Sequence, residues 1–403
     1  MLKRLAYLSG EYPRATDTFI QREVAGLRNA DFQVETISVR RPSTREQGTD
    51  EQAKERAGTH YLIPCSPFRL LSDHFRLFFQ NPIRYCQGVW LALSIRSPGL
   101  KSLLYQIFYF AEAGLVAAHM KQRGLTHIHN HAPDACGYVA MLASQIGGLT
   151  YSMTLHGFGI FAEPSRWRLK EKIERSLFTI CISQHGRSQA MLWSDHKFWD
   201  KIHVVHCGVN SDHAQSRVHT GVGQNILFVG RLDYVKGLPV LIDAFSILNK
   251  QNNGTHLHIV GDGPAKSQLQ QIVKEKGLDK RIIFYGYQSQ TELKDQFDKA
   301  DIFVMTSFVE GIPVVLMEAM SNGVPVIAPN ITGIPELVQH DECGFLTTPA
   351  DSKCLAERME ILLNDTEQRN RFAVNGLQKV KDKFNITIEI DKLTSIFKRY
   401  SEG

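Results

Sequence analysis

The sequence predicts an α/β fold with two Rossmann-like, doubly wound domains that face an interdomain cleft. Short apolar runs alternate with longer amphipathic runs, as in parallel strands that are joined by helices. This alternation stops near the middle of the chain and then begins again. A length of 403 residues also suits two domains better than one. We therefore expect two consecutive α/β domains, with ligands at the carboxyl ends of their strands.

The first domain is expected to span residues 1–207. Its predicted strands are Leu5–Ser9, Val34–Val39, Thr126–His129, Tyr151–Leu155, Phe178–Ile182 and Ile202–His206, with helices such as Thr18–Asn29 and Pro133–Gly147. Between about 42 and 104 the alternation lapses into the aromatic, arginine-bearing stretch FRLLSDHFRLFFQNPIRYCQGVWLALSIR. We expect an insertion of helices there. Packed helices are the favoured interpretation, and a membrane-facing patch or a lid is the alternative.

Residues 208–224 are polar and glycine-bearing, so they are predicted to link the domains. The second domain should span 225–383. Its predicted strands are Ile226–Val229, His256–Val260, Ile282–Tyr285, Ile302–Met305, Val324–Ala328 and Gly344–Leu346, separated by helices near Leu238–Asn249, Ala265–Lys276, Thr291–Lys299, Pro313–Asn322 and Ser352–Leu363. Residues 384–403 form an amphipathic pattern, which predicts a last helix that returns to the first domain.

The charge of the chain is unevenly distributed. Residues 1–205 hold 25 Lys and Arg against 17 Asp and Glu, a net of +8, although the whole chain is only +5. A basic half fits either an anionic partner, such as a phospholipid surface, or a solvated basic surface. Seven cysteines without a Cys-x-x-Cys pair argue against a disulfide framework or a structural zinc site. With no signal-peptide core and no long apolar run, we expect a cytoplasmic protein.

The segment SFVEGIPVVLMEAM places two glutamates, Glu310 and Glu318, eight residues apart. Pro313 is predicted to open a helix between them. The N-terminus of a helix is a natural seat for phosphate, and carboxylates bind hydroxyl groups, so the segment suggests a sugar nucleotide. Eight residues along a helix span about 12 Å. A retaining glycosidase holds its two carboxyl groups about 5–5.5 Å apart, so separate roles for the two glutamates fit better.

Two further motifs lie in the second half. In FVGRLDYVKG, Gly230 ends a strand, Arg231 follows at once, and Lys236 precedes a helix. Cations at these places could neutralise a pyrophosphate, or they could be ordinary surface charges. The stretch HIVGDGP contains Gly261 and Gly263, which by themselves are a weak nucleotide-loop signal.

Taken together and in this order, the motifs resemble the family-4 glycosyltransferases, which are retaining enzymes of GT-B fold. The resemblance is clear over residues 226–346. It implies that Glu310 contacts the transferred sugar, Glu318 binds the ribose hydroxyls, and Arg231 and Lys236 contact the diphosphate. The remaining donor contacts that it implies are Gly230, the base contact Tyr287, and the backbone of Gly311, Ile312, Pro313 and Val314, which covers the sugar and the distal phosphate.

The resemblance also extends to the first half. In TLHGF, His156 matches a histidine that touches the donor sugar. The opening SGEYPRATDTFIQREV resembles enzymes of bacterial exopolysaccharide and colanic-acid-type clusters. Many members have two glycines in the first loop, where this chain has only Gly10, and the resemblance implies that Gly10 contacts the donor. Arg14, Thr16 and Asp17 are expected to contact the acceptor.

Three histidines, His127, His129 and His131, alternate along one predicted strand and therefore share a face. Three imidazoles could bind a metal, but neutral histidines in hydrogen bonds are the favoured interpretation. The Asp-x-Asp pair of metal-dependent GT-A glycosyltransferases does not occur in the sequence. We therefore expect no metal site and no cofactor, with catalysis that is independent of metal.

The expected function is transfer of a sugar from a nucleoside-diphosphate donor, UDP- or GDP-linked, to a saccharide or lipid-linked acceptor. This activity would serve cell-surface polysaccharide or glycolipid synthesis. Peripheral contact with the inner membrane face is an expected partnership, and nucleic acid is not. Two alternatives stay open: a sugar-nucleotide epimerase of similar fold, and a non-catalytic binding subunit derived from a transferase.

Overall fold

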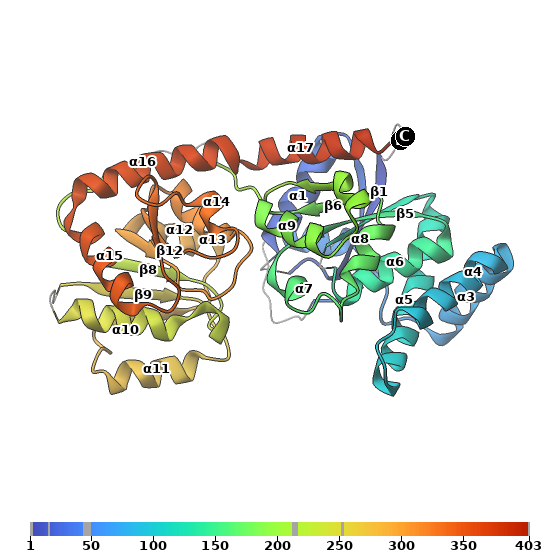
Figure 1. Ribbon diagram of the computed structural model, residues 1–403, viewed down its shortest axis with the longest axis horizontal. Helices are drawn as coiled ribbons and strands as arrows, with labels where there is room; N and C mark the ends of the chain where they lie inside the picture. Colours follow the sequence, from blue (N-terminus) through green and yellow to red (C-terminus); the bar gives the residue numbers. More distant parts are fainter. Residues whose placement is uncertain are drawn as a thin grey trace. The chain divides into compact units, whose positions relative to one another are not determined.

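The computed structural model describes residues 3–14, 17–42, 50–131, 133–211, 217–250 and 254–401 (Figure 1). The chain forms two compact units. One contains the residues up to His206 together with those from Glu389 onward, and the other contains Cys207–Ile388. Each unit is a parallel sheet covered by helices on both faces. The predicted fold class of two doubly wound α/β domains is therefore confirmed.

The first unit is built on a seven-stranded parallel sheet of order β3-β2-β1-β4-β5-β6-β7. Its strands are β1 Arg4–Glu11, β2 Gln33–Arg40, β3 His60–Tyr61, β4 His127–His131, β5 Thr150–Leu155, β6 Thr179–Cys181 and β7 Ile202–Val204. Its helices are α1 Thr18–Asn29, α2 Asp50–Gly58, α3 Pro67–Gln80, α4 Pro82–Ser94, α5 Leu100–Arg123, α6 Ala135–Gly147, α7 Phe158–Ala162, α8 Leu169–Arg175, α9 Gln184–Leu192 and the 3₁₀ helix η1 His196–Lys201.

Alternate residues of β1 pack on opposite sides of this sheet. Ala6 and Leu8 join the core under α5 and α6, whereas Leu5 and Tyr7 join the core under α1. The last helix, α17 Ile386–Arg399, contributes Leu393 and Phe397 to this second core. The C-terminal part of the chain thus completes the hydrophobic core of the first unit.

Strands β3 and β4 of the first unit differ from the sequence prediction. Strand β3 was not predicted, because two residues give no readable alternation. Strand β4 reaches His131, two residues beyond its predicted end, so all three alternating histidines lie in the sheet. The predicted insertion near 42–104 contains α2, α3 and α4 and the start of α5, and residues 43–49 lie outside the described part.

The second unit is built on a six-stranded parallel sheet of order β10-β9-β8-β11-β12-β13. Its strands are β8 Asn225–Val229, β9 His256–Val260, β10 Ile282–Gly286, β11 Ile302–Val304, β12 Val326–Pro329 and β13 Gly344–Thr347. Its helices are η2 Tyr234–Lys236, α10 Leu238–Asn249, α11 Lys266–Glu275, α12 Gln290–Lys299, α13 Val314–Ser321, α14 Ile334–Leu337, α15 Ser352–Asn364 and α16 Thr366–Lys383.

Here too the core has two layers. Side chains from α10, α11 and α15 pack on one face of the sheet, and side chains from α12, α13 and α14 pack on the other, while α16 contributes Phe372 to the first layer and Val380 to the second. The described residues of the predicted linker belong to the second unit. Among them, His219 is buried, and its Nε2 contacts the carbonyl oxygen of Gly323 at 2.9 Å.

One helix start was predicted wrongly. Pro313 is not the first helical residue but the capping residue, with an extended backbone (φ −70°, ψ 121°), and α13 begins at Val314. The locked φ of proline is compatible with both positions. The sequence alone therefore placed the start one residue early.

Within the described residues, α5 is the helix that is long and apolar enough to cross a membrane by length and composition. Of its most apolar 18-residue window, 56% is buried inside the structure, and a core helix of a soluble protein passes the same test. Its buried residues include Glu112 and the run Ala113–Met120. The cytoplasmic location stays a prediction.

Candidate functional site

In each sheet the strand order reverses direction at one place, between β8 and β11 in the second unit and between β1 and β4 in the first. Ligands of doubly wound folds bind at the carboxyl ends of the strands beside such a reversal. The predicted site residues Lys236 and Glu310 follow β8 and β11, and Gly10 lies at the end of β1. The topology thus brings these residues to two places where ligand binding is expected.

Lys236 and Glu310 form an ion pair in the second unit. The Nζ atom of Lys236 lies 2.5 Å from Oε1 of Glu310, and the two side chains are 24% and 12% exposed. A charge-assisted hydrogen bond of this length is among the stronger polar contacts in proteins. The pair therefore joins the end of η2 to the loop after β11, 74 residues apart in the sequence.

The backbone around Lys236 is held against the loop that follows β11. The hydroxyl of Thr306 donates to the carbonyl oxygen of Lys236 at 3.0 Å, and the amide of Phe308 donates to that of Val235 at 2.8 Å. Gly237 has φ +61°, and a Cβ atom there would lie 2.2 Å from the carbonyl oxygen of Thr306. Only glycine fits this approach, so the sequence Lys-Gly fixes the position of the cation.

Arg231 is the more exposed cation of the second unit's motif. Its side chain is 71% exposed, and Nε lies 3.6 Å from Oδ2 of Asp233. Asp233 also accepts from the amide of Val235 and so caps η2. Arg231 is accessible to an anion. Because it is so exposed, its ion pair with Asp233 contributes little to the stability of the fold.

The two glycines of HIVGDGP, Gly261 and Gly263, pack against the backbone of the segment that carries Arg231. A Cβ at Gly261, where φ is +135°, would lie 1.9 Å from the carbonyl oxygen of Gly230, and one at Gly263 would lie 2.3 Å from that of Leu232. The amide of Gly230 donates to the carbonyl oxygen of Val260 at 3.0 Å. These glycines therefore allow two backbones to pack closely, and Gly230 is one partner of that contact.

The other donor residues of the prediction lie on α13 and after β10. Glu318 is half-buried within α13, next to the buried Met317. Before this helix, Ile312 is buried and Gly311 is half-buried. Tyr287 is exposed and follows β10, which is separated from β8 by β9. The structure thus gives Tyr287 a place at the sheet edge, further from the strand reversal than Glu318.

At the reversal in the first unit, a cavity of about 260 Å³ is lined by residues from the end of β1 and from the segment after β4. The residues that line it are Ser9, Gly10, Glu11, Arg14, Asp17, Ile20, Val39, Arg40, Tyr109, Glu112, Asp134, Ala135 and Cys136. Nothing lies within 4 Å of where a Cβ on Gly10 would be, so packing does not demand glycine there.

Two ion pairs lie in the wall of this cavity. Arg14 Nε is 2.8 Å from Oδ2 of Asp17, and Arg40 is 3.3 Å from Glu112. Burial raises the pKa of Glu112, and the nearby Arg40 opposes that rise. The charged groups that line the cavity carry both signs of charge, and apolar side chains such as Ile20 and Val39 lie among them. Thr16, which we expected beside Arg14, lies outside the described residues.

His156 directly follows β5 and is half-buried. Its Nε2 lies 2.7 Å from Nδ1 of His131, and the two rings stack with centroids 5.0 Å apart. Burial, followed by the neighbouring His131, holds the pKa of His156 well below its usual range. His156 is therefore a neutral imidazole at neutral pH.

The two other strand histidines are held by hydroxyl groups of β5. His127 contacts Thr150 and Ser152, each at 2.8 Å, and His129 contacts Ser152 at 2.7 Å and Thr154 at 2.9 Å. Burial lowers the pKa of His127 to about 3 and that of His129 well below the ordinary value. Both ring nitrogens of each residue are engaged, as expected for neutral, hydrogen-bonded histidines.

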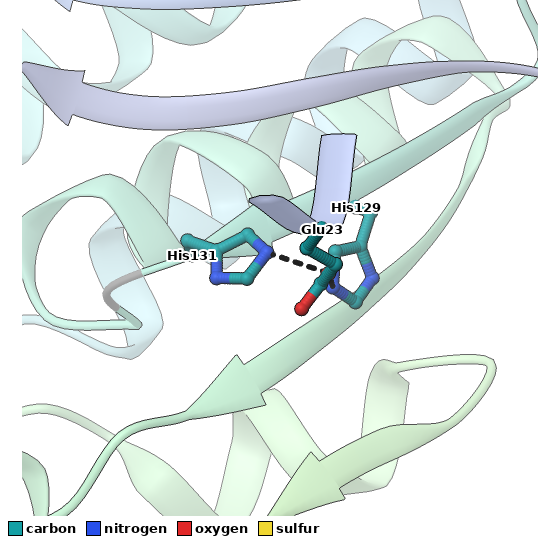
Figure 2. A group of neighbouring side chains, drawn as sticks. All are labelled: Glu23, His129 and His131. Atoms are coloured by element: carbon teal, nitrogen blue, oxygen red, sulfur yellow. Dashed lines mark hydrogen bonds and ion pairs between the residues drawn. The ribbon is translucent and has the colours of Figure 1, made fainter. Parts of the chain in front are cut away.

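Figure 2 shows Glu23 of α1 pointing toward His129 and His131. Its Oε1 lies 3.1 Å from Nε2 of His131, and the hydroxyl of Tyr7 lies 2.5 Å from the same oxygen. Glu23, His129 and His131 offer potential metal-ligand atoms within 4.8 Å of one another. A cation here would have to replace the hydrogen bonds that these groups already make.

The contacts among Glu23, His131 and His156 determine which group donates and which accepts in each hydrogen bond. An ionised Glu23 only accepts, so Nε2 of His131 carries the proton and Nδ1 is the acceptor. His156 then donates from Nε2, which leaves the lone pair on its Nδ1. A carboxylate thus sets the tautomer of a histidine that it does not touch.

Sequence reasoning missed Glu23. Its position gave a signal, because Glu23 lies four residues after Phe19 and four before Leu27, on the apolar side of an amphipathic helix. A carboxylate at such a position is costly unless it has a buried partner. It also missed Thr306, whose role depends on which strands are neighbours.

Comparisons with known proteins identify the family of the chain. Residues 213–379 match the family described as glycosyl transferases group 1. The chain is 33% identical to the protein of Escherichia coli (strain K12) that is named "putative colanic acid biosynthesis glycosyltransferase WcaL", over 96% of this chain and 97% of that protein. The chain belongs to the group 1 glycosyltransferases.

A second relative is AmsK of Erwinia amylovora, a glycosyltransferase named for amylovoran biosynthesis, with 26% identity over 98% of this chain and 99% of its own length. Among solved structures, HepE of Anabaena in complex with UDP superposes with a TM-score of 0.72 and 18% identity, over 98% of this chain and all of that chain. The fold is accordingly that of the GT-B glycosyltransferases, and the chain is a glycosyltransferase.

Proposed function

We propose that this glycosyltransferase moves a sugar, with retention of anomeric configuration, from a nucleoside-diphosphate sugar to a hydroxyl of a saccharide or lipid-linked acceptor. The pathway is the synthesis of a cell-surface polysaccharide. Two relatives that align over nearly their whole length carry names from exopolysaccharide synthesis. A solved neighbour has been captured with UDP-glucose, which supports a UDP-linked donor.

The observation that carries the proposal is the ion pair between Lys236 and Glu310. It places one cation and one carboxylate at the carboxyl ends of the two strands where the sheet order reverses. A sugar diphosphate is bound by both kinds of group, because its phosphates form ion pairs with cations and its hydroxyl groups donate hydrogen bonds to carboxylates. In this proposal Lys236 binds the diphosphate and Glu310 binds the sugar.

The chemical problem of the transfer is the departure of a nucleoside diphosphate. A cation at about 4 Å from the developing charge is worth roughly 4 kcal/mol at an effective dielectric of 20. The cation also stabilises the bound donor before reaction, so only part of this energy lowers the barrier. A net stabilisation of the transition state by about 2–4 kcal/mol corresponds to roughly a 30- to 1,000-fold increase in rate. Lys236 is assigned this role, with support from Arg231 and from the amides that open α13.

The roles of the other donor contacts follow from their places. Glu318, half-buried in the second turn of α13, is proposed to accept from the ribose hydroxyls. Tyr287 is proposed to stack on the base, a role that its exposed ring suits. His156, a neutral imidazole, is proposed to accept from a hydroxyl of the donor sugar.

The acceptor is proposed to bind in the cavity between the end of β1 and the segment after β4. Arg14 and Arg40 would attract a phosphate, and Asp17 and Glu112 would accept from hydroxyl groups. A saccharide carried on a pyrophosphate lipid combines both features. The acceptor hydroxyl would attack on the face from which the diphosphate leaves, which preserves the configuration.

The first test is a thermal-shift panel of UDP-, GDP- and ADP-sugars. A ligand that binds the native state raises its apparent stability, by about 2.7 kcal/mol at a hundredfold excess over Kd. A UDP-sugar should give the largest shift. Equal small shifts for all three nucleotides would contradict the assigned donor site.

The second test uses the best donor in labelled form, first without an acceptor. Formation of a new sugar nucleotide would reveal an epimerase and overturn the proposal. Lipid extracts and surface polysaccharide fragments are then added, and the anomeric configuration of the labelled product is read by NMR. An inverted product would exclude the front-face route.

A further inference from the structure

Helices α3 and α4 present large apolar side chains to solvent. On α3, Phe68, Leu71, Phe75 and Phe79 recur at helical spacing and form one stripe, and α4 adds a second stripe. We call the two stripes the aromatic face, which consists of Phe68, Leu71, Phe75, Phe79, Ile83, Trp90 and Leu93. All of its members are exposed, with Phe68 at 85% and Trp90 at 73%.

The opposite sides of the same helices already pack against the protein. Leu77 of α3 and Leu91 of α4 are buried. His74 of α3 contacts the carbonyl oxygen of Ala111 in α5 at 3.1 Å, and a Cβ on Gly88 of α4 would meet Ile146 of α6. In Figure 1, α3 and α4 lie side by side outside α5 and α6. The helices are thus apolar on two sides, although only one side packs against the rest of the first unit.

Such a surface is unusual on a soluble monomer, because an extended apolar patch normally marks a binding site. The rings also contact one another. The centroids of Phe75 and Phe79 are 6.3 Å apart, and Phe78 meets Phe79 edge-on at 5.4 Å. Phe75, Phe78 and Phe79 therefore form a continuous aromatic surface in the C-terminal half of α3.

The charge around the aromatic face has one sign. Residues 66–111, all of which the structure describes, contain the cations Arg69, Arg76, Arg84, Arg96 and Lys101. Their one carboxylate, Asp73, is buried with Oδ2 3.7 Å from Arg69. No exposed carboxylate interrupts the cations in this stretch. An apolar patch framed by cations complements a bilayer with an anionic surface.

A groove beside the patch adds a place for a head group. It has a volume of about 200 Å³ and lies between α3 and α5, where Arg76 and Lys121 line it together with Gln80. Lys121 donates to the side-chain oxygen of Gln80 at 3.0 Å. Two cations on facing helices can hold the phosphate of a lipid while its chains lie under Phe75 and Phe79.

We propose that the aromatic face docks the protein onto an anionic lipid bilayer. The rings of Phe68, Phe75, Phe79 and Trp90 enter the interfacial region, where aromatic side chains are favoured. Arg76, Arg84 and Lys121 lie at the level of the lipid phosphates. This inference goes beyond the proposed glycosyl transfer, because it concerns the protein without donor or acceptor.

The first experiment is co-sedimentation of the full chain with vesicles of phosphatidylglycerol and phosphatidylethanolamine, compared with pure phosphatidylcholine. Binding should be at least about tenfold stronger on the anionic vesicles and should weaken as salt rises. The variant Phe75→Ser, Phe79→Ser, Trp90→Ser should lose this binding. Because these side chains are exposed, circular dichroism should show an unchanged fold.

The matched control is Leu192→Ser together with Val374→Ser, two exposed aliphatic side chains on other helices. It should bind as the wild type does. For the charge, Arg76→Gln with Lys121→Gln should weaken binding to anionic vesicles at least fivefold. Lys280→Gln with Lys353→Gln, exposed cations of the second unit, should not.

Fluorescence locates the contact. Brominated lipid should quench the wild type, and Trp90→Phe should remove most of the quenching, whereas Trp193→Phe should not. Three results would overturn the proposal: equal binding to both vesicle types, unchanged binding of the triple serine variant, or no binding to either vesicle. In the last case, a wild-type dimer that the triple variant abolishes would identify the face as an interface between copies.

Discussion

Lys236 and Glu310 meet at 2.5 Å across the strand reversal of the second unit, and each is mostly shielded from water. The carboxylate holds the ammonium group in place and gives it a partner where burial has removed part of its water. The two residues therefore act together as one ion pair rather than as two independent ligand contacts. Their roles on phosphate and sugar stay proposals, but their proximity is a property of the fold.

The first prediction concerns Lys236→Ala. Turnover should fall at least 30-fold with the fold retained, because the developing diphosphate charge loses its cation. Single-turnover kinetics with the best donor will measure this. Lys280→Ala, at an exposed site elsewhere in the second unit, should leave turnover unchanged. A folded Lys236→Ala protein with near-normal turnover would remove Lys236 from the mechanism.

The second prediction concerns Glu318→Gln. The substitution keeps the shape of the side chain in α13 but removes the charge that accepts from the ribose hydroxyls. Hydrogen bonds to a charged partner contribute about 1.5–3 kcal/mol, so the Kd for the nucleotide should rise roughly 10-fold or more. Titration calorimetry will measure it. Glu357→Gln, an exposed position of α15, is the control, and equal affinities for the two variants would refute the ribose contact.

The third prediction tests Glu23 as a positioning residue. In Glu23→Gln the negative charge beside His131 disappears, which makes protonation of the His131–His156 pair harder. The acid limb of the pH–rate profile should therefore move to lower pH, and kcat/KM should drop about tenfold as the His156 tautomer becomes less fixed. A purely structural role would leave the acid limb in place. Glu163→Gln is the control.

The sequence predicted the features that depend on neighbouring residues, and it did not predict contacts between residues far apart along the chain. Strands such as β8 and β11 were readable because buried parallel strands are short apolar runs. Glu310 and Lys236 were identified by their motifs. Their contact was not, because it requires β8 and β11 to be neighbours, and that order is set by the crossover of the whole chain.

The same reasoning explains the other misses. The position of Glu23 on the apolar side of α1 indicates a buried partner but does not identify it, because His131 lies on the distant strand β4. The two-residue β3 offers no pattern, and its pairing with β2 supplies what its own sequence does not. Contacts between distant segments are therefore the part that local patterns leave out.

The fourth prediction concerns acid. The buried His127 has a pKa of about 3 in the folded chain, against about 6.5 when unfolded. Between these values the unfolded state binds a proton that the folded state excludes, so the free energy of unfolding falls as pH falls from about 6.5 toward 3. In His127→Gln, the decrease in the free energy of unfolding between pH 7 and pH 5 should be about 2 kcal/mol smaller than in the wild type.

Urea unfolding followed by tryptophan fluorescence suits this measurement, because all four tryptophans lie in the first unit. His185→Gln, at an exposed position of α9, is the control. The same pH slope for His127→Gln and the wild type would show that His127 does not account for the loss.

The fifth prediction compares two glycines with positive φ. Gly261 has φ +135° and would place a Cβ 1.9 Å from the carbonyl oxygen of Gly230, whereas Gly277 has φ +65° and open space around it. Gly277→Ala should cost about 1 kcal/mol, the strain of a left-handed residue. Gly261→Ala adds a clash with backbone and should cost about 3 kcal/mol or more.

Calorimetry of the second unit's transition will separate the two variants. Gly261→Ala should also weaken nucleotide binding, because relief of the clash must move Gly230 and with it the segment that carries Arg231. Gly277→Ala lies at the end of α11 and should bind as the wild type does. If the two variants were equally stable, the close approach of Gly261 to Gly230 would not be a feature of the folded protein, and the position of Arg231 would need another explanation.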